Sequence, residues 1–358
     1  MAAYIAKRIL LMFPTLLGVV TAAFVIVQFV PGGPVERAIA QMQGHGGQGA
    51  TAQFSTAEAA PPQEGAYRGA QGIDPEFIKE LKALYGFDKP AHERYLKMLW
   101  DYARFDLGRS YYRDVPVTQL VLEKMPVSIS LGLWTTLLVY LIGVPLGIAK
   151  AVRAGTAFDF WTSLAVFLGH AIPAFLFAIV LMVLFAGGRY FDLFPLRGLV
   201  SNTWSDMSAL QRVFDYLWHI TLPVISLTLG AFASLTILTR NAFLDEMSKP
   251  YVLTARAKGA GRARVLWGHV FRNAMLVVIA GFPAAFVASF FTGSLLVEYI
   301  FSLDGLGLLG YEAAVGRDFP VVLGVVYLYA LLGVGMKLVT DLAYVAVDPR
   351  IHFGGAEG

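Results

Sequence analysis

The sequence contains no cysteine, few charged residues and no strong excess of either charge. Without cysteine the chain forms no disulfide bond, thiolate metal site or cysteine nucleophile. Charged residues make up 15% of the 358 residues, against roughly 25% in soluble domains, which disfavours a soluble enzyme. The net charge of +3 is too small for nucleic-acid binding as a main task. The phosphate-binding pattern G-x-x-x-x-G-K-[S/T] is also absent, so the chain has no ATPase motif of its own.

Long apolar stretches are what the sequence has in abundance. Six of them cover residues 9–30, 128–149, 161–186, 220–239, 274–297 and 320–347. A helix of about 20 apolar residues crosses the hydrocarbon core of a bilayer, so these stretches predict an all-α polytopic membrane protein with six transmembrane helices. A cleaved signal peptide is the alternative for 9–30. Its apolar core is too long for that and no small-residue cleavage site follows it, so we interpret it as a permanent anchor.

Positive charges in the short loops predict the orientation. Lys and Arg gather before the first stretch, after the second and between the fourth and fifth, whereas 188–219 and 298–319 hold few of them. Because positively charged loops stay in the cytoplasm, we expect both termini to be cytoplasmic. The predicted regions are a cytoplasmic end with the first span, an extracytoplasmic helical domain inserted after it, a transmembrane core and a cytoplasmic tail: 1–30, 31–127, 128–347 and 348–358.

The predicted outside domain contains a flexible stretch and two helices. Residues 43–72 are rich in Gly and Pro, which indicates a stretch without a core. Asp74-Pro75 predicts the start of one helix. A second helix is expected over 90–107. Five of its residues share the face that we expect to be buried: Tyr95, Leu96, Leu99, Tyr102 and Ala103.

The loop between the fourth and fifth spans, residues 240–273, is the most informative segment. It contains seven Lys or Arg and only two acidic residues, Asp245 and Glu246. Attraction to anionic lipid would explain this charge, but not the order in which small and basic side chains alternate on a short helix that a glycine ends. Small side chains let such a helix enter a partner's cleft, where flanking Arg and Lys pair with acidic groups. The residues concerned are Tyr251, Ala255, Arg256, Ala257, Lys258, Gly259 and Arg262.

This segment resembles the EAA loop of permease subunits of binding-protein-dependent ABC importers, and in particular their dipeptide/oligopeptide branch. The match rests on Tyr251-Val252, Ala255-Arg256-Ala257-Lys258-Gly259, His269 and Arg272-Asn273-Ala274. Further matches, over most of 1–353, include Tyr85-Gly86-Phe87-Asp88-Lys89-Pro90, Ile172-Pro173-Ala174-Phe175 and Asp348-Pro349-Arg350. Two positions depart from the pattern. Leu253 stands where the broader motif has its glutamate, which leaves the anchor of the loop open, and Asp304 stands where the branch has proline.

The resemblance implies that the chain forms part of a transport pathway in the bacterial inner membrane and that a separate protein supplies the energy for transport. It implies a second homologous permease subunit and a cytoplasmic ATPase that uses ATP and Mg and clamps the loop. It also implies a periplasmic binding protein that touches 74–127 and 189–218 and delivers oligopeptides or peptide-like compounds such as microcin C. We expect this chain itself to hold no cofactor or metal, to bind no nucleic acid and to be no enzyme.

Charged residues near the outer ends of the fifth and sixth spans have two interpretations. Glu298, Asp304, Arg317 and Asp318 form an outer gate or a receptor contact, or they are ordinary interfacial charges. The run Gly305-Leu306-Gly307-Leu308-Leu309-Gly310 between them fits G-x-G-x-x-G in form. No βαβ unit is predicted around it, so we interpret it as a tight turn.

Ionisable groups and glycines inside the spans leave further alternatives. Lys337 and Asp341 lie one helical turn apart and either neutralise each other or serve the pathway. His170 is either a proton relay or a hydrogen-bonded group at a kink. Gly143 and Gly147 permit close helix approach, whereas the proline between them favours a kink instead.

Two other classes of protein stay open on the sequence alone. An ion-driven secondary transporter works without an ATPase, but the inverted repeats and mid-membrane acidic groups of that class are scarce here. A membrane-anchored enzyme needs a catalytic cluster. His92-Glu93 lacks the second histidine of a zinc-protease motif, and the pattern G-x-S-x-G is absent.

Overall fold

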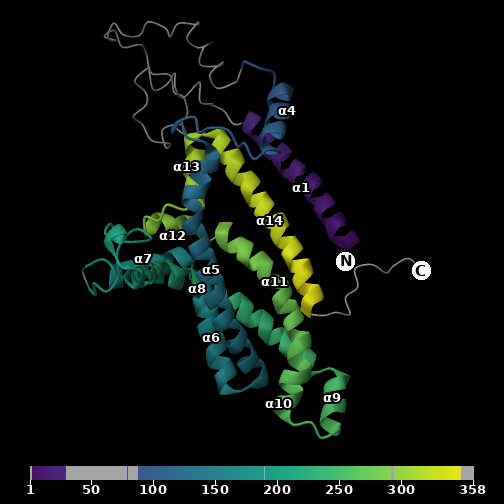
Figure 1. Cartoon of the computed structure of the whole chain (residues 1–358). Helices are drawn as coiled ribbons and strands as arrows, with labels where there is room; N and C mark the ends of the chain where they lie inside the picture. Colours follow the sequence, from purple (N-terminus) through teal and green to yellow (C-terminus); the bar gives the residue numbers. More distant parts are fainter. Residues whose placement is uncertain (1, 30–78, 80–87, 189, 292–293, 348–358) are drawn as a thin grey trace, which may run out of the picture. The chain divides into compact units, whose positions relative to one another are not determined.

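The computed structural model describes residues 2–29, 79, 88–188, 190–291 and 294–347, and the regular elements in these ranges are helices (Figure 1). The first five are α1 (Ala2–Phe29), α4 (Ala91–Tyr102), α5 (Val117–Val152), α6 (Ala157–Ala171) and α7 (Ala174–Phe185). The short 3-10 helix η2 (Trp204–Asp206) precedes α8 (Ala209–Met247), α9 (Pro250–Ala257) and α10 (Arg262–Val265). The π-helix η3 (Leu266–Val270) leads into α11 (Phe271–Phe291), α12 (Ser294–Ile300), α13 (Leu306–Gly316) and α14 (Phe319–Val347).

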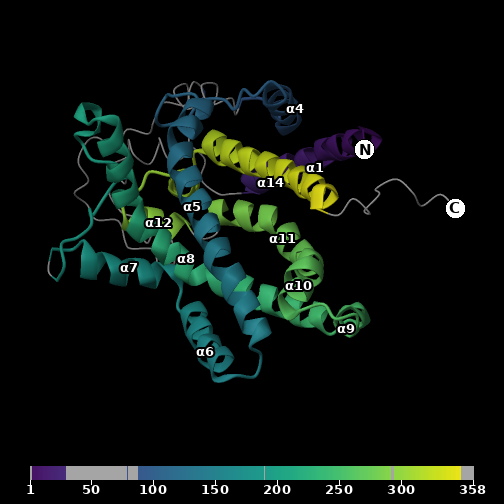
Figure 2. The same ribbon diagram turned by 60° about the horizontal axis from the view of Figure 1, so that its bottom comes forward.

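Five stretches of helix within the described residues are long and apolar enough to cross a membrane. They are Ile5–Phe29, Val117–Val152, Ala209–Met247, Arg262–Val287 and Phe319–Ala343. A sixth crossing results if α6 and α7 together form one span. The two helices meet at 91°, so this span would be a broken one (Figure 2). The prediction of an all-α membrane protein with six spans is confirmed in this sense.

The bend between α6 and α7 follows from Ile172 and Pro173. Proline has no backbone N–H and pushes the residue before it out of the helical region. Ile172 has φ −91° and ψ 121°, and Pro173 has φ −57° and ψ 141°. The third apolar stretch, 161–186, is therefore divided between α6 and α7, and the kink expected beside His170 is confirmed. The side chain of His170 is exposed.

The chain divides into two compact units. The first comprises Met1–Phe13, Glu123–Leu309 and Leu331–Gly358, and the second comprises Pro14–Leu122 and Gly310–Ala330. The stretch 43–72 that was predicted to be flexible and the tail 348–358 lie outside the described residues, as does the helix expected after Asp74 apart from residue 79. The outside domain as a separate body therefore stays a prediction.

Helix α4 of the second unit exposes part of the face that was expected to be buried. Tyr102 is buried and Tyr95 is half-buried, in agreement with the prediction. Leu96 is 62% exposed, however, and Ala103 is exposed as well. The difference arises because α4 packs along one narrow side, where the hydroxyl of Tyr95 lies 2.6 Å from the hydroxyl of Thr21 in α1.

Helices α5 and α8 of the first unit approach each other closely at two glycines. A Cβ atom on Gly143 would lie 3.3 Å from the carbonyl oxygen of Phe232, and one on Gly147 would lie 2.6 Å from the Cβ of Thr239. No larger residue fits at Gly147 without a shift of one helix. The close-approach interpretation of these glycines is confirmed, and α5 continues as one helix through Pro145.

Candidate functional site

Residues 240–273, which we call the coupling segment, fold into the end of α8, the short helices α9 and α10, the π-helix η3 and the start of α11. Pro250 occupies the first turn of α9, where its missing N–H is not needed. Gly259 follows α9 with φ +83°, a left-handed conformation that glycine adopts without strain. The predicted short helix with a terminal glycine is confirmed.

Glu246 anchors this segment from the last turn of α8. Its side chain is buried and accepts hydrogen bonds from the Tyr251 hydroxyl at 2.8 Å and from the Asn273 side-chain amide at 3.0 Å. Lys249 forms an ion pair with it at 2.6 Å. One carboxylate thus ties α8, α9 and α11 together. Leu253, at the position where the broader motif has glutamate, is 63% exposed and plays no such part.

The electrostatics around Glu246 follow from these contacts. Burial and the nearby Glu246 carboxylate raise the pKa of the Tyr251 hydroxyl. The hydrogen bond to the same carboxylate raises the pKa of the Lys249 ammonium. Both groups are therefore held in their protonated forms, in which they donate to Glu246. The sequence does give one indication of this anchor. Asp245 and Glu246 are the only acidic residues among seven Lys and Arg in the segment, so one of them was a natural partner for a basic side chain.

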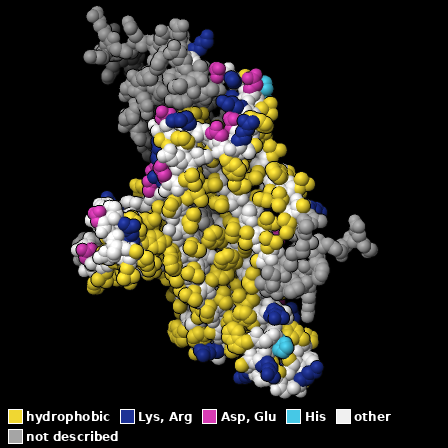
Figure 3. Space-filling model, viewed as in Figure 1, with side chains coloured by type: hydrophobic (Ala, Val, Ile, Leu, Met, Phe, Trp, Pro, Cys, Tyr) yellow, Lys and Arg dark blue, Asp and Glu magenta, His cyan; other side chains and the backbone are white. Residues whose placement is uncertain are grey.

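An apolar core fixes one side of the coupling segment and leaves the other side free. Val252 of α9 and Val265 of α10 are buried in a cluster with Ile148 of α5 and Phe243 of α8. Most of the predicted contact residues lie on the uncovered side. Ala255 is half-buried, and the exposed ones are Arg256, Ala257, Lys258, Gly259 and Arg262. Lys and Arg side chains gather over α9 and α10 in Figure 3. Tyr251 differs from the others because its hydroxyl is hydrogen-bonded to Glu246.

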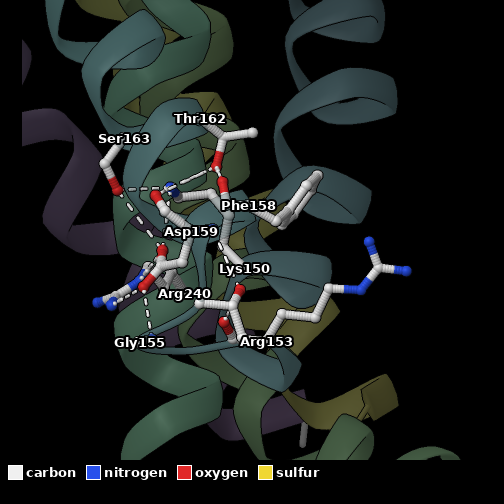
Figure 4. Close-up of polar contacts among 9 residues, drawn as sticks. Lys150, Arg153, Gly155, Phe158, Asp159, Thr162, Ser163 and Arg240 are labelled. Atoms are coloured by element: carbon white, nitrogen blue, oxygen red, sulfur yellow. Dashed lines mark hydrogen bonds and ion pairs between the residues drawn. The ribbon is translucent and has the colours of Figure 1, made fainter.

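A buried ionic cluster joins α5 and α6 to Arg240 of α8, the first residue of the coupling segment (Figure 4). The Asp159 carboxylate lies 3.1 Å from the Lys150 ammonium and receives two hydrogen bonds from the Arg240 guanidinium, at 3.0 and 2.7 Å. Lys150 is only 1% exposed and also donates to the hydroxyls of Thr162 and Ser163. The sequence placed Lys150 and Arg240 among the loop charges that set orientation, and Asp159 was not singled out. Here both bases serve as structural partners of one carboxylate.

Glu298 of the first unit is fully buried and caps the start of α13. Its carboxylate accepts a hydrogen bond from the backbone N–H of Leu308 at 2.7 Å, and Ser128 of α5 accepts one from the N–H of Leu306 at 2.8 Å. A Cβ on Gly305 would lie 2.5 Å from the Glu298 carboxylate. The interpretation of the glycine-rich run as a tight turn is wrong, because Leu306–Gly310 form the start of α13 and Gly305 alone precedes the helix. The glycine leaves room for the carboxylate, whose charge is favourable at a helix N-terminus.

The other predicted outer residues occupy different settings. Asp304 is 61% exposed and forms an ion pair with Lys124. In the second unit, Arg317 is half-buried with φ +58°, and Asp318 is buried. The Asp318 carboxylate accepts hydrogen bonds from the Ser110 hydroxyl at 2.5 Å and from the backbone N–H of residue 111 at 3.1 Å. Direct receptor contact does not fit Glu298 or Asp318, because both side chains point into the protein. Among the four, Asp304 offers the most exposed side chain.

The charged groups of the last span are paired differently from the sequence expectation. Asp341 forms an ion pair with Arg8 of α1 at 2.8 Å, while the side chain of Lys337 is exposed. Mutual neutralisation of Lys337 and Asp341 is therefore wrong. The two residues lie on one helical face, but the stronger partner for the carboxylate comes from another helix.

Comparison with known proteins identifies the class. The family model of binding-protein-dependent transport system inner membrane components matches residues 143–353, and the chain belongs to this family. It is 55% identical to the inner membrane ABC transporter permease protein YejB of Escherichia coli O157:H7, over 99% of this chain and 100% of that protein. It is 52% identical to the peptidoglycan transport system permease protein YejB of Agrobacterium fabrum, over 99% of each chain. It is 33% identical to the oligopeptide transport system permease protein AppB of Bacillus subtilis, over 99% of this chain and 100% of that protein.

These matches confirm the family resemblance that the sequence motifs indicated. They identify the chain as an inner membrane transport component of the ABC permease type. The relatives are permeases rather than enzymes, which argues against the hypothesis of a membrane-anchored enzyme.

Proposed function

We propose that the chain is a permease subunit of an ATP-driven importer for oligopeptides or peptide-like compounds, microcin C-like molecules included. The names of the peptide and peptidoglycan permeases to which it is similar support this substrate class. The observation that carries the proposal is the coupling segment, a basic surface on two short helices whose base is fixed by Glu246 and an apolar core.

In this proposal the exposed side of α9 enters a cleft of a separate ATPase. That partner binds the ATP and Mg, because the present sequence has no phosphate-binding loop. Val252 shares its apolar cluster with Ile148 of α5 and Phe243 of α8. Displacement of α9 therefore moves the ends of α5 and α8 together. The ion pairs of Asp159 with Lys150 and Arg240 hold α6 to these two ends.

The remaining partners belong to the same proposal. A second homologous permease completes the pathway, and a periplasmic binding protein delivers the substrate to 74–127 and 189–218. Both termini and the coupling segment face the cytoplasm, as the distribution of Lys and Arg predicts. The exposed Asp304 is then on the side that the binding protein approaches.

Two substitutions at Gly259 test the proposal. Nothing lies within 4 Å of a Cβ at this residue, and its φ of +83° tolerates Asn and Asp better than other side chains. Gly259→Asp adds a negative charge to the docking surface, whereas Gly259→Asn has nearly the same shape without the charge. In vesicles that contain the complete importer, we expect Gly259→Asp to abolish uptake of a labelled tripeptide while ATP hydrolysis continues, and Gly259→Asn to retain much of the uptake.

The outcomes separate the alternatives. Unchanged uptake in Gly259→Asp would refute the docking role of α9. Uptake by the purified chain alone, driven by an ion gradient, would refute the dependence on a separate ATPase and favour a secondary transporter.

A further inference from the structure

We propose that helix α4 lies at the surface of the lipid bilayer, with Leu96, Trp100 and Phe105 in contact with lipid. These side chains are 62%, 60% and 60% exposed. Leu96 and Trp100 are four residues apart in α4 and share one face, and Phe105 follows just after the helix ends. A group of large exposed apolar side chains marks a surface that something covers.

Contacts with α1 place α4 beside a membrane span. The Tyr95 hydroxyl lies 2.6 Å from that of Thr21, and its ring centroid lies 5.3 Å from that of Phe24. Closer to the end of α1, the Arg94 guanidinium donates to the side chain of Gln28 at 2.7 Å. Three successive turns of α1 therefore meet the first half of α4.

The length of the span sets the depth of this contact. Thr21 precedes the end of α1 at Phe29 by eight residues, or about 12 Å of helix. The apolar part of α1, Ile5–Phe29, is about 37 Å long, whereas the hydrocarbon core is about 30 Å thick. With about 4 Å of α1 projecting beyond the core at each end, Gln28 and its partner Arg94 lie at the edge of the core, and Thr21 with the ring of Tyr95 lies about 8 Å inside it.

The surface of α1 next to this contact is itself apolar and uncovered. Val25, Ile26 and Phe29 are 46%, 63% and 81% exposed, as expected for residues of a span that faces lipid. The exposed residues of α4 adjoin this lipid-facing surface, because Tyr95 and Arg94 contact α1 between Thr21 and Gln28. Continuity with a membrane-facing surface favours lipid over a soluble protein as the occupant.

The polar groups around Trp100 suit the boundary between hydrocarbon and water. The Arg104 guanidinium lies 4.2 Å from the centre of the Trp100 ring, and Lys97 next to Leu96 is exposed. Trp rings favour the level of the headgroups, where long Lys and Arg side chains reach toward phosphate. An amphipathic helix with Trp and Leu on one side and basic groups beside them is typical of interfacial helices.

Site-directed spin labelling tests the proposal on the full chain in lipid vesicles. The sequence has no cysteine, so Leu96→Cys, Trp100→Cys and Lys97→Cys each give one labelled position. The measurement is the accessibility of each label to oxygen, which concentrates in lipid, and to a water-soluble nickel complex. We expect the ratio to shift toward oxygen at 96 and 100 and toward nickel at 97, the matched control one residue away.

Two results would overturn the proposal. Equal nickel accessibility at all three positions would place α4 in water. Immobile labels at 96 and 100 that neither reagent reaches would show that a protein covers the face. A second measurement leaves the helix nearly intact: brominated phospholipid should quench the emission of the unmodified chain more than that of Trp100→Phe, and equal quenching would also refute lipid contact.

Discussion

Replacing Gly305 by alanine should destabilise the protein, and removing the Glu298 carboxylate at the same time should cancel most of that loss. A Cβ at residue 305 would lie 2.5 Å from the carboxylate carbon of Glu298, so one of the two groups must move. The carboxylate is fully buried and cannot retreat without weakening its 2.7 Å hydrogen bond from the Leu308 N–H. Overpacking of this kind raises the free energy of the folded state by about 1–3 kcal/mol.

The Glu298→Ala variant loses stability for a different reason. The N–H of Leu308 then has no carboxylate acceptor in a buried setting, which costs about 1–3 kcal/mol. In the double variant the alanine at 305 meets no carboxylate, so the double variant should be about as stable as Glu298→Ala alone. The double-mutant cycle should therefore give a coupling energy of about 1–3 kcal/mol between the two sites.

Unfolding of the full chain in mixed micelles, titrated with SDS, measures these free energies. Gly281→Ala is the matched control, since nothing lies within 4 Å of a Cβ at this glycine of α11, and it should cause no loss. Strictly additive losses at 298 and 305, or a Gly305→Ala variant as stable as the wild type, would show that the carboxylate does not fill the space beside Gly305.

Two further predictions concern the other polar clusters. Asp159→Asn leaves Lys150 buried without its counter-ion, so it should destabilise the chain by about 3–5 kcal/mol in the same unfolding assay. Adding Lys150→Met should recover part of this loss, and no recovery would contradict the pairing. The raised pKa of Tyr251 means that its neutral form stabilises the fold, a contribution complete below the ordinary tyrosine pKa of about 10 and lost as the pH rises through the raised value. Unfolding midpoints against pH should therefore fall more steeply above pH 10 in the wild type than in Tyr251→Phe, and parallel curves would refute this.

The sequence predicted the elements whose signal is local. Apolar length located the spans, and Pro250 and Gly259 marked the two ends of α9. Of the predicted contact residues in and after α9, Arg256, Ala257, Lys258 and Gly259 are exposed, whereas Tyr251 and Ala255 pack against the apolar cluster. The kink at Pro173 was foreseeable as a kink, but the 91° turn was not, because the angle depends on what each half packs against.

The partners of buried charges were beyond the reach of sequence spacing. Helical periodicity favoured Lys337 as the partner of Asp341, yet the carboxylate pairs with Arg8, 333 residues away in the sequence. On the sequence, Glu298 was either part of an outer gate or receptor contact or an interfacial charge. Its burial depends on a space left by Gly305 and a contact with α13. Such pairs form where helices meet, and a single sequence does not show which helix faces meet.

The π-helix η3 determines the direction in which the side chains of the following helix α11 point. A wide turn holds one residue more than an α-helical turn, and each residue of an α-helix advances the side-chain direction by about 100°. Asn273 stands at the third position after Leu266–Val270 and reaches Glu246 at 3.0 Å. If this turn were an ordinary α-helical turn, the Asn273 amide would point about a quarter of a circle away from the Glu246 carboxylate. The fifth span would then present a different face to the helices that pack against it.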